Sequence, residues 1–540
     1  MSACTRADVR LRMRVIVDCL LSRRSPTWAR AEHGSVTWAV PGARAGGDML
    51  RFKVFKDGAP AKSVDLTGAY LVGSDRVPLR AELKFSKGEI VSDSRARGAA
   101  AVSLMWPVGD GRMMLETPRL PERQQPYNLH VELARGQMMR ISQKREDWGL
   151  YDFPEGQPYY DQVDAARARL IDAVTAPDDI AAAEFGEAAI AAGVEAGEAL
   201  TTFHAGVFLQ RRRAAKQMVK LPLGCRIDAS QTRAEYLHCL TEVFQFGVLP
   251  FRWAALEPKE GAHRPARIDV WLKHLQKQKL PAWGASLLSL DEDQLPDWLH
   301  RWAKDYDHFR ASATKYIQYV LKTYGPYVQA WEAVSGIHAR SGLGFTYDQI
   351  LELTRTSCLL VKQLAPKSSA IIGITLPWGE YYPADPRTIP PLLYAEMAVQ
   401  NGIHFDAFGL EIRFGTGDPG HYVRDMLQVS ALLDRFGGLG KPLHIIAAGV
   451  PSGGGNDSDG CWRGKWSAET QAEWVKQFYR IALSKPFVET VTCLQLADAT
   501  DQDGLLDMDS VSKPAYQEVL SLKRELAGDE IPEGRHKRPL

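Results

Sequence analysis

Cysteine is scarce in this chain of 540 residues, and its pattern carries information. The seven cysteines are scattered, odd in number and never spaced as C-x-x-C. This pattern argues against both a disulfide framework and a zinc site. We therefore expect reduced thiols, no structural metal and a reducing compartment.

The chain also lacks an excess of charge and long apolar runs. Lys and Arg number 66 against 65 for Asp and Glu, a formal net charge of +1, so no global field favours nucleic acid or an anionic membrane. The apolar run VIVDCLL at 15–21 is interrupted by Asp18 and followed by Arg23 and Arg24. It is too short for a membrane span and poor as a signal peptide. We expect a cytoplasmic protein without nucleic acid or membrane partners.

Regular patterning begins just after Met49. Residues 1–48 have no sustained period and are interpreted either as a disordered arm or as sequence upstream of an initiator Met49. From 49 to 155, short alternating runs separated by turns predict a β-sandwich-like domain, a candidate carbohydrate-binding module or packing domain. The predicted strands include LRFKVF, ELKF, AAVSLMWPV, RMMLE and YNLHVELA, the last with Leu129, Val131 and Leu133 on one face.

Helical spacing dominates the following segment. Residues 156–219 are rich in alanine and broken by TAPDD at 175–179, which predicts a helical connector. Its basic run RRR at 211–213 is interpreted as a solvated helix end. Residues 525–540 form a charged C-terminal tail.

Eight apolar runs between 220 and 524 alternate with helix-length segments. This alternation predicts an α/β fold, a (β/α)₈ TIM barrel, whose function should lie at the C-terminal ends of its strands. The predicted strands are LGCRID, FGVLPFRW, LPAWGASLL, VQAWEAVSG, AIIGITLPW, FDAFGLEIRFG, PLHIIAAGV and VETVTCLQLAD.

Six phrases occur in a characteristic order along this region. They are RWAALEPKEG at 252–261, QLPDWL at 294–299, WEAVSG at 331–336, FDAFGLEIRF at 405–414, KPLHIIAAGVP at 441–451 and GLLDMDSVSKPAY at 504–516. The ordered set resembles glycoside hydrolase family 10, the endo-β-1,4-xylanases. The resemblance implies carbohydrate metabolism, a barrel and an oligo- or polysaccharide ligand.

The resemblance breaks at the catalytic positions. Family members are retaining enzymes with two glutamates, an acid/base and a nucleophile, about 5–5.5 Å apart. The family's strand-four pattern places its proton donor at Gly336 and the preceding Asn at Ser335, and strand seven places the nucleophile at Ala447. No Glu or Asp occurs at 333–347 or 435–456, so a small alignment shift restores neither carboxylate.

The positions around the catalytic pair have changed as well. Leu249 and Pro250 stand where the family has polar residues that hold sugar hydroxyls, and only a basic group remains, as Arg252. On strand six the family's Gln becomes Glu411, and the His that orients the nucleophile becomes Arg413. Loss of both carboxylates together with their supports predicts a protein without the family's hydrolysis.

Other carboxylates remain as alternative catalytic candidates. They are Glu411, Glu380 and acids of the strand-eight loop, foremost Asp498 and then Asp501 and Asp503. Glu411 and Arg413 lie two apart on a strand and face the same way, so they are expected to pair with each other or with a ligand. Glu332 lies deeper along its strand and is expected to anchor the barrel interior.

The candidate ligand-binding residues combine polar groups with aromatic rings. A flat ring against a pyranose face is a common arrangement, with core packing as the alternative for each tryptophan. The candidates are Arg252, Trp253, Ser335, Glu411, Arg413 and Trp462, with Trp378 and Trp466 as further rings near the predicted loops. We expect no metal and no cofactor.

Three functions therefore stay open at this point. The favoured one is a catalytically silent family 10 relative that binds a glycan. The second is an active O-glycosyl hydrolase with relocated carboxylates, which fold alone does not exclude. The third is a non-catalytic structural or interaction protein without a sugar ligand.

Overall fold

The structure is a computed structural model, and it describes most of the chain between residues 50 and 528. The gaps are 95–97, 153–156, 303, 340–341, 386, 417–418, 456–458 and 500–501. The expectations for residues 1–48, for Asp501 and for most of the C-terminal tail lie outside the described residues.

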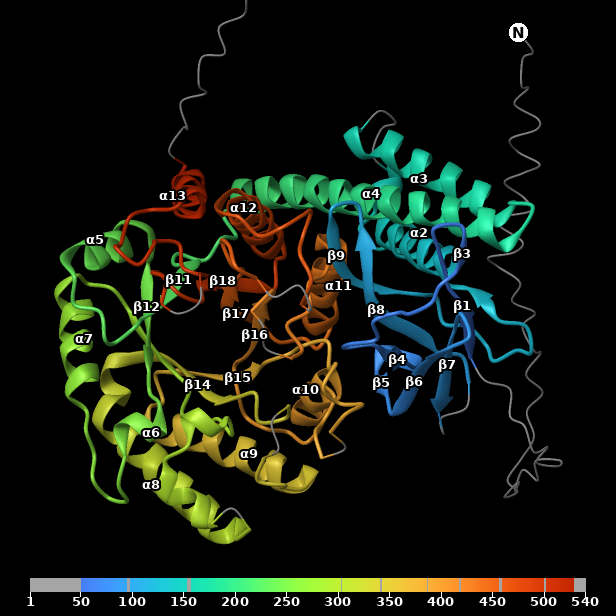
Figure 1. The fold of residues 1–540 in the computed structure, drawn as a ribbon. Coiled ribbons are helices and arrows are strands. Elements are labelled where there is room, and N and C mark those ends of the chain that lie inside the picture. Colours follow the sequence, from blue (N-terminus) through green and yellow to red (C-terminus); the bar gives the residue numbers. More distant parts are fainter. Residues whose placement is uncertain are drawn as a thin grey trace, which may run out of the picture. The chain divides into compact units, whose positions relative to one another are not determined.

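Eight parallel strands close into a barrel, as the alternating apolar runs predict (Figure 1). Each strand pairs with its neighbour in sequence, and β11 closes the circle with β18. Burial explains the apolar composition: β17, LHIIAAG, is buried at every residue, facing either the barrel interior or the surrounding helices. The strands are β11 (Leu223–Arg226), β12 (Phe246–Pro250), β13 (Ala282–Ala285), β14 (Val328–Ser335), β15 (Ser369–Ile374), β16 (Ala407–Arg413), β17 (Leu443–Gly449) and β18 (Val488–Cys493).

Amphipathic helices follow these strands and cover the barrel. In α9, for example, Thr346 and Gln349 form a reciprocal capping box at the N-terminus. The helices are α5 (Ala234–Val243), α6 (Trp253–Leu256), α7 (Ala266–Lys277), α8 (Tyr306–Tyr324), α9 (Tyr347–Leu364), α10 (Pro391–Gln400), α11 (Met426–Gly437), α12 (Ala468–Ser484) and α13 (Pro514–Ala527). Short 3₁₀ turns are η3 (Glu292–Gln294), η4 (Asp297–Trp302) and η5 (Gly325–Tyr327).

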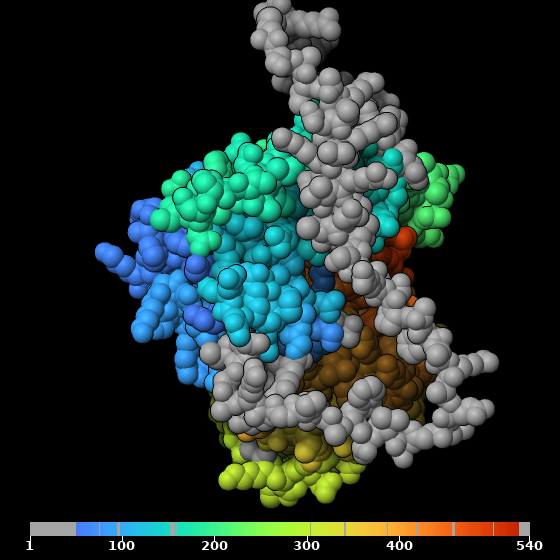
Figure 2. Space-filling model, turned by 90° about the vertical axis from the view of Figure 1, so that its right-hand side faces the viewer, coloured from blue at the N-terminus to red at the C-terminus, as the bar shows by residue number. Residues whose placement is uncertain are grey.

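Small sheets, antiparallel except for the parallel pair of β1 and β10, precede the barrel, which confirms a β-domain in front of it. One sheet has the order β10-β1-β7-β6 and the other β5-β4-β8-β9, and β2 and β3 form a separate pair. Figure 2 shows a face of the molecule to which this region, coloured blue to cyan, contributes much of the surface. The strands are β1 (Arg51–Lys53), β2 (Phe55–Lys56), β3 (Ala59–Pro60), β4 (Tyr70–Val72), β5 (Pro78–Leu79), β6 (Ala81–Ser86), β7 (Glu89–Ser94), β8 (Ala101–Val108), β9 (Gly111–Glu116) and β10 (Tyr127–Asn128), with the 3₁₀ turn η1 (Ser74–Arg76).

The strand predicted at YNLHVELA is wrong beyond its first two residues. Strand β10 ends at Asn128, and Leu129 begins the helix α2 (Leu129–Asp147). The apparent alternation of Leu129, Val131 and Leu133 misled because the first turns of α2 are buried all round, including His130 and Glu132. Without an exposed face, the period of 3.6 residues leaves no trace in the sequence.

The predicted helical connector is present as two helices, and α2 precedes it. Helices α3 (Pro158–Val174) and α4 (Asp179–Ala214) follow the 3₁₀ turn η2 (Leu150–Asp152). The basic run at the end of α4 is not wholly solvated, because Arg212 is buried and its Nη1 donates to the carbonyls of Leu483, Lys485 and Val488 at 2.7–2.9 Å. These bonds fix the end of α4 to the segment between α12 and β18.

Strand β9 connects the β-domain to the barrel loops that follow β16 and β17. The backbones of Arg112 and Cys461 exchange hydrogen bonds of 2.8 and 2.9 Å, and Met114 N donates to Val423 O at 2.8 Å. The side chain of Gln428 also donates to Met114 O at 2.8 Å. One side of the barrel mouth, near the ends of β16 and β17, is therefore engaged by the β-domain.

No helix within the described ranges is both long and apolar enough to cross a membrane.

Candidate binding site at the barrel mouth

Gly336 and Ala447 both lie toward the C-terminal ends of barrel strands. Gly336 directly follows β14, and Ala447 lies on β17 as the register partner of Glu411 on β16. Ala447 is fully buried. The C-terminal end of the barrel thus holds Gly336, Ala447 and the candidate carboxylate Glu411.

The backbone at Gly336 has a conformation that suits glycine. Its φ is +61°, in the left-handed region. A Cβ placed there would lie 2.6 Å from Thr375 Oγ1 and 3.1 Å from Thr375 Cγ2. Any side chain at this position therefore meets both backbone strain and the side chain that follows β15.

Glu411 is held by a histidine from the loop after its own strand. Its Oε1 lies 3.5 Å from His421 Nε2, and His421 Nδ1 lies 3.0 Å from Thr416 Oγ1. Burial raises the pKa of Glu411, but His421, Arg413 and Arg226 outweigh burial and lower it to about 2. Glu411 is therefore an ionised carboxylate with a fixed partner.

Glu332 and Arg226 form an ion pair inside the barrel. Arg226 Nη2 donates to Glu332 Oε2 at 3.1 Å, and Arg226 Nε donates to the carbonyl of Ile446 at 2.9 Å. The Glu332 side chain is 4% exposed. Burial raises its pKa, while Arg226 and Ser335 act in the opposite direction. Glu332 thus anchors the interior, as expected, and Arg226 joins strands from opposite sides of the barrel.

Glu411 and Arg413 interact electrostatically, and Arg413 lowers the pKa of Glu411. Each also has a partner from a loop: Arg413 Nη2 lies 3.8 Å from Asp503 Oδ2, and Glu411 Oε1 lies 3.5 Å from His421 Nε2. Spacing along one strand does not reveal these loop partners.

The remaining candidate carboxylates are parts of ion pairs. Glu380 Oε1 accepts from Arg424 Nη2 at 2.5 Å, and both side chains are almost wholly buried. Asp498 Oδ1 accepts from Lys513 Nζ at 2.6 Å and from Gly504 N at 2.9 Å. Each carboxylate holds neighbouring segments together.

The tryptophans expected as sugar platforms lie in the core. Trp253 stacks on Tyr316 with ring centroids 4.9 Å apart, and its Nε1 donates to Glu257 at 2.8 Å. Trp462 is fully buried, and its Nε1 donates to Glu198 Oε1 at 2.6 Å. Trp466 is also buried, and Trp378 stands 4.7 Å from the guanidinium of Arg424. Neither Trp253 nor Trp462 presents a free ring face to a ligand.

A pocket of about 160 Å³ opens at the ends of β11–β14. Its lining combines apolar residues, among them Val248, Leu249 and Ala285, with polar groups. The polar lining consists of Arg226, Arg252, Ser286, Ser289, Asp291, Gln294 and Ser335. Sequence reasoning had selected Arg252 and Ser335 from this set and missed the others. The one available signal was Arg226, the only charged residue of the otherwise uncharged strand β11.

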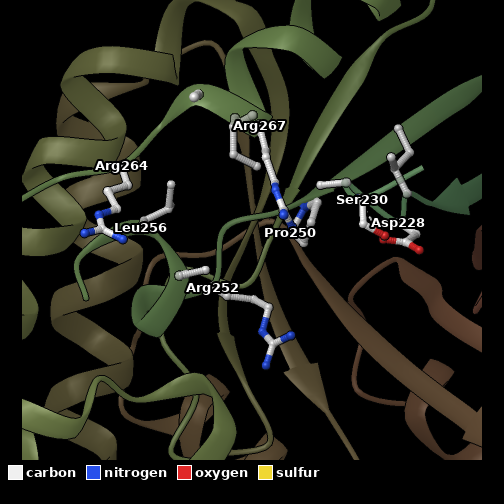
Figure 3. A pocket seen from close by; sticks show the side chains of 12 residues that line it. Asp228, Ser230, Pro250, Arg252, Leu256, Arg264 and Arg267 are labelled. Carbon is white, nitrogen blue, oxygen red and sulfur yellow. Dashed lines mark hydrogen bonds between the residues drawn. The ribbon is translucent and has the colours of Figure 1, made fainter. Parts of the chain in front are cut away.

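A second, wider hollow of about 540 Å³ adjoins this pocket. The two share Ile227, Pro250 and Arg252 as lining residues. In Figure 3, Arg267 extends toward Pro250, and Asp228 lies beside Ser230. Arg252 is exposed and paired with Asp293 Oδ2 at 2.9 Å. The two hollows therefore adjoin one another along these shared residues.

Comparisons with known proteins identify similar barrels among solved structures. No family model and no curated protein matches the sequence. Xylanase 10B from Thermotoga maritima is 16% identical over 59% of this chain and 99% of its own, with a TM-score of 0.45. Xylanase 10B from Thermotoga petrophila RKU-1, solved with xylobiose, is 16% identical over 58% and 97%, with a TM-score of 0.44. A GH10 structure from Paenibacillus barcinonensis is 16% identical over 59% and 99%, with a TM-score of 0.45. These three solved structures are family 10 xylanases, and the likeness concerns the barrel fold.

Proposed function

We propose that this protein binds a carbohydrate in the pocket at the ends of β11–β14 and does not hydrolyse it. The observation that carries the proposal is the conformation of Gly336 against Thr375. A retaining glycosidase needs a carboxylic acid at the strand end and a second carboxylate on the facing strand. The first position has no room for a side chain, and the second carries only the methyl group of Ala447.

The state of the neighbouring carboxylates supports the same conclusion. Arg226 holds Glu332, His421 holds Glu411, Arg424 holds Glu380 and Lys513 holds Asp498. A general acid must carry a proton near neutral pH and reach the leaving oxygen. Each of these four carboxylates is already engaged by a neighbouring cation or histidine, and Glu380 is buried and absent from the pocket lining.

The pocket itself supports binding of a small polyol. Its serines, Gln294, Asp291 and two arginines supply both donors and acceptors beside apolar residues. A volume of about 160 Å³ is small compared with drug-sized sites of about 300–1,000 Å³, so it suits one sugar unit. The adjoining hollow gives further units of a chain a place to continue.

Calorimetric titration with a panel of β-linked oligosaccharides, xylotriose and cellotriose included, tests this function. We expect at least one panel member to bind the wild type, and Ser286→Trp to abolish binding by filling the pocket. Ser63→Trp, at an exposed loop position of the β-domain, is the matched control and should bind as the wild type does. Binding that survives Ser286→Trp would show that the sugar binds elsewhere on the protein. If no oligosaccharide of the panel binds, the result would contradict a carbohydrate function.

A second candidate function rests on the contrast between Glu332 and Glu411. The pKa of Glu332 is raised and that of Glu411 is lowered, the division that acid and nucleophile show in many hydrolases. In this reading Glu332 would be the acid and Glu411 the ionised partner. Turnover of aryl β-glycosides by the wild type, lost in both Glu332→Gln and Glu411→Gln, would establish it. Arg226, which bonds Glu332 directly, makes it the weaker proposal.

A further inference from the structure

Four arginines converge on a small pocket between the β-domain, helix α2 and the barrel. Arg76 ends the turn η1, Arg140 lies on α2, Arg424 precedes α11 and Arg435 lies on α11. Glu116 is the one carboxylate in the described lining of this pocket. Like charges from three parts of the fold, η1, α2 and the region of α11, thus meet at one cavity.

Two of these guanidinium groups are buried and incompletely bonded. Arg140 is 7% exposed and Arg424 is 1% exposed. Arg140 donates through Nη1 to the carbonyl of Glu116 at 3.2 Å and through Nη2 to Gln137. Arg424 donates to Gln428 at 3.1 Å, to Tyr70 at 3.2 Å and to Glu380 at 2.5 Å. In both, however, the Nε has no acceptor among the described residues.

The protein's own carboxylates do not supply the missing acceptors. Glu380 is engaged with the Nη2 of Arg424, and Asp425 accepts from the side-chain and backbone N–H groups of Gln428. Burial, with repulsion from Arg76 and Arg424, lowers the pKa of Arg140 against the pull of Glu116 and Asp425. A buried donor left unsatisfied costs about 1–3 kcal/mol, and more when it is charged.

We propose that this pocket binds one small anion of halide size, with chloride as the natural occupant. The cavity amounts to about 30 Å³, which exceeds the roughly 10–15 Å³ that one water molecule needs on the same measure. A single spherical anion therefore fits, where it can accept from several guanidinium N–H groups at once.

The anion would hold the β-domain, α2 and the barrel together. It lies against η1 of the β-domain, against α2 and against α11 of the barrel, so its charge offsets repulsion among arginines that come from all three. This anion site is separate from the proposed sugar site, which lies at the ends of β11–β14.

Thermal unfolding of the full chain in different sodium salts tests this site. At equal ionic strength, chloride should raise the melting temperature by about 1–3 °C relative to gluconate, with saturation as the concentration rises. The ³⁵Cl NMR line should broaden in the presence of the protein, and added bromide should reverse the broadening. Identical melting curves in chloride and gluconate with no excess line width would overturn the proposal.

Arg76→Gln is the informative variant, because Arg76 is only half-buried and its loss should be tolerated. We expect the variant to lose most of the chloride effect and to be as stable as the wild type in gluconate, since one repelling charge is gone. Arg267 is an exposed arginine that lines the hollow of about 540 Å³ at the barrel mouth, so Arg267→Gln should keep the full chloride effect. A full chloride effect in Arg76→Gln would show that the anion does not bind in this pocket.

Discussion

Thr375 fills the space that a side chain on Gly336 would need. Its Oγ1 lies 2.6 Å from the position of a Cβ on Gly336, and its Cβ lies 3.4 Å from the same point. Residue 336 directly follows β14 and residue 375 directly follows β15, so the contact belongs to the barrel rim. The strand end that resembles a catalytic position is therefore closed by its neighbour.

The variant Gly336→Ala should lose about 2–4 kcal/mol of unfolding free energy. A left-handed backbone costs an alanine about 1–2 kcal/mol, and the contact with Thr375 adds to this cost. Gly402→Ala is the matched control, because Gly402 has a φ of +63° and open space around its Cβ position. It should lose only about 1–2 kcal/mol, measured by urea unfolding.

Adding Thr375→Ala to Gly336→Ala should recover the part of the unfolding free energy that is lost to the steric contact. The part that is lost to the left-handed backbone should remain. The double variant Gly336→Ala/Thr375→Ala should then be more stable than the sum of the two single losses predicts. Strict additivity in this double-mutant cycle would show that Thr375 is not the obstacle.

Removing either partner of the Arg226–Glu332 pair should have unequal consequences. The Arg226 side chain is 30% exposed and can be hydrated alone, whereas Glu332 is 4% exposed. We expect Arg226→Met to cost about 3 kcal/mol and Glu332→Gln about 1 kcal/mol, measured by denaturant unfolding near pH 7. The penalty of Arg226→Met should shrink at acidic pH, because the isolated Glu332 can then be protonated. Equal penalties, independent of pH, would contradict this account of the pair.

Glu411 should make the protein sensitive to acid. Its pKa in the folded state is about 2 against an ordinary 4.5, so between these values the unfolded chain binds the proton more readily. Stability from this group is present above about pH 4.5 and is lost as the pH falls toward 2. Glu411→Gln should flatten the pH dependence in that window by about 1–3 kcal/mol, in unfolding experiments at a series of pH values.

Glu122→Gln provides the control for this measurement. Glu122 is exposed, lies between β9 and β10 and makes no hydrogen bond or ion pair within the described residues. Its variant should follow the wild-type pH profile. A Glu411→Gln profile that also matches the wild type would show that His421 does not hold the carboxylate in solution.

The barrel could be predicted from sequence because its signals are local. A buried parallel strand must be apolar on both faces, and a covering helix must be amphipathic, so the eight alternating units are visible one by one. Helix α2 shows where this reasoning fails. Its first turns are covered on all sides, so the segment from Leu129 to Leu133 carries no helical period and reads as a strand.

The candidate site could be predicted only in part, because its contacts join distant segments. The absence of a carboxylate at Gly336 and Ala447 can be read from the sequence, whereas the contact that a side chain on Gly336 would meet lies in Thr375. His421, from a loop, is a partner of Glu411 that the sequence does not reveal. Trp462 is expected as a sugar platform, yet Glu198 from α4 holds its indole in the core. These contacts depend on the paths of the loops and on packing between domains.

The wild-type protein should show no measurable hydrolysis of xylan or of aryl β-xylosides. Both carboxylates are needed for the two-step retaining route, and neither position carries one. A chromogenic assay over pH 4–9 measures this, with Glu411→Gln in parallel. Turnover by the wild type that Glu411→Gln abolishes would contradict the proposal and establish relocated carboxylates.

Restoring the two glutamates should also fail to create a xylanase. In Gly336→Glu/Ala447→Glu the first substitution meets Thr375 and a left-handed backbone, so the introduced acid cannot take its place without moving the rim. The second would place a carboxylate beside Glu411, its register partner, in a fully buried position. Mutual repulsion and burial would raise the pKa of that carboxylate and keep it protonated, which removes the nucleophile.

Leu249 and Pro250 still provide no hydrogen-bonding side chain for a sugar, and displacements near 1 Å can cost about 10²-fold in rate. The outcome is measured as turnover of the double variant, after circular dichroism has established that it is folded. Robust xylanase activity in that variant would show that the barrel still positions a sugar for catalysis.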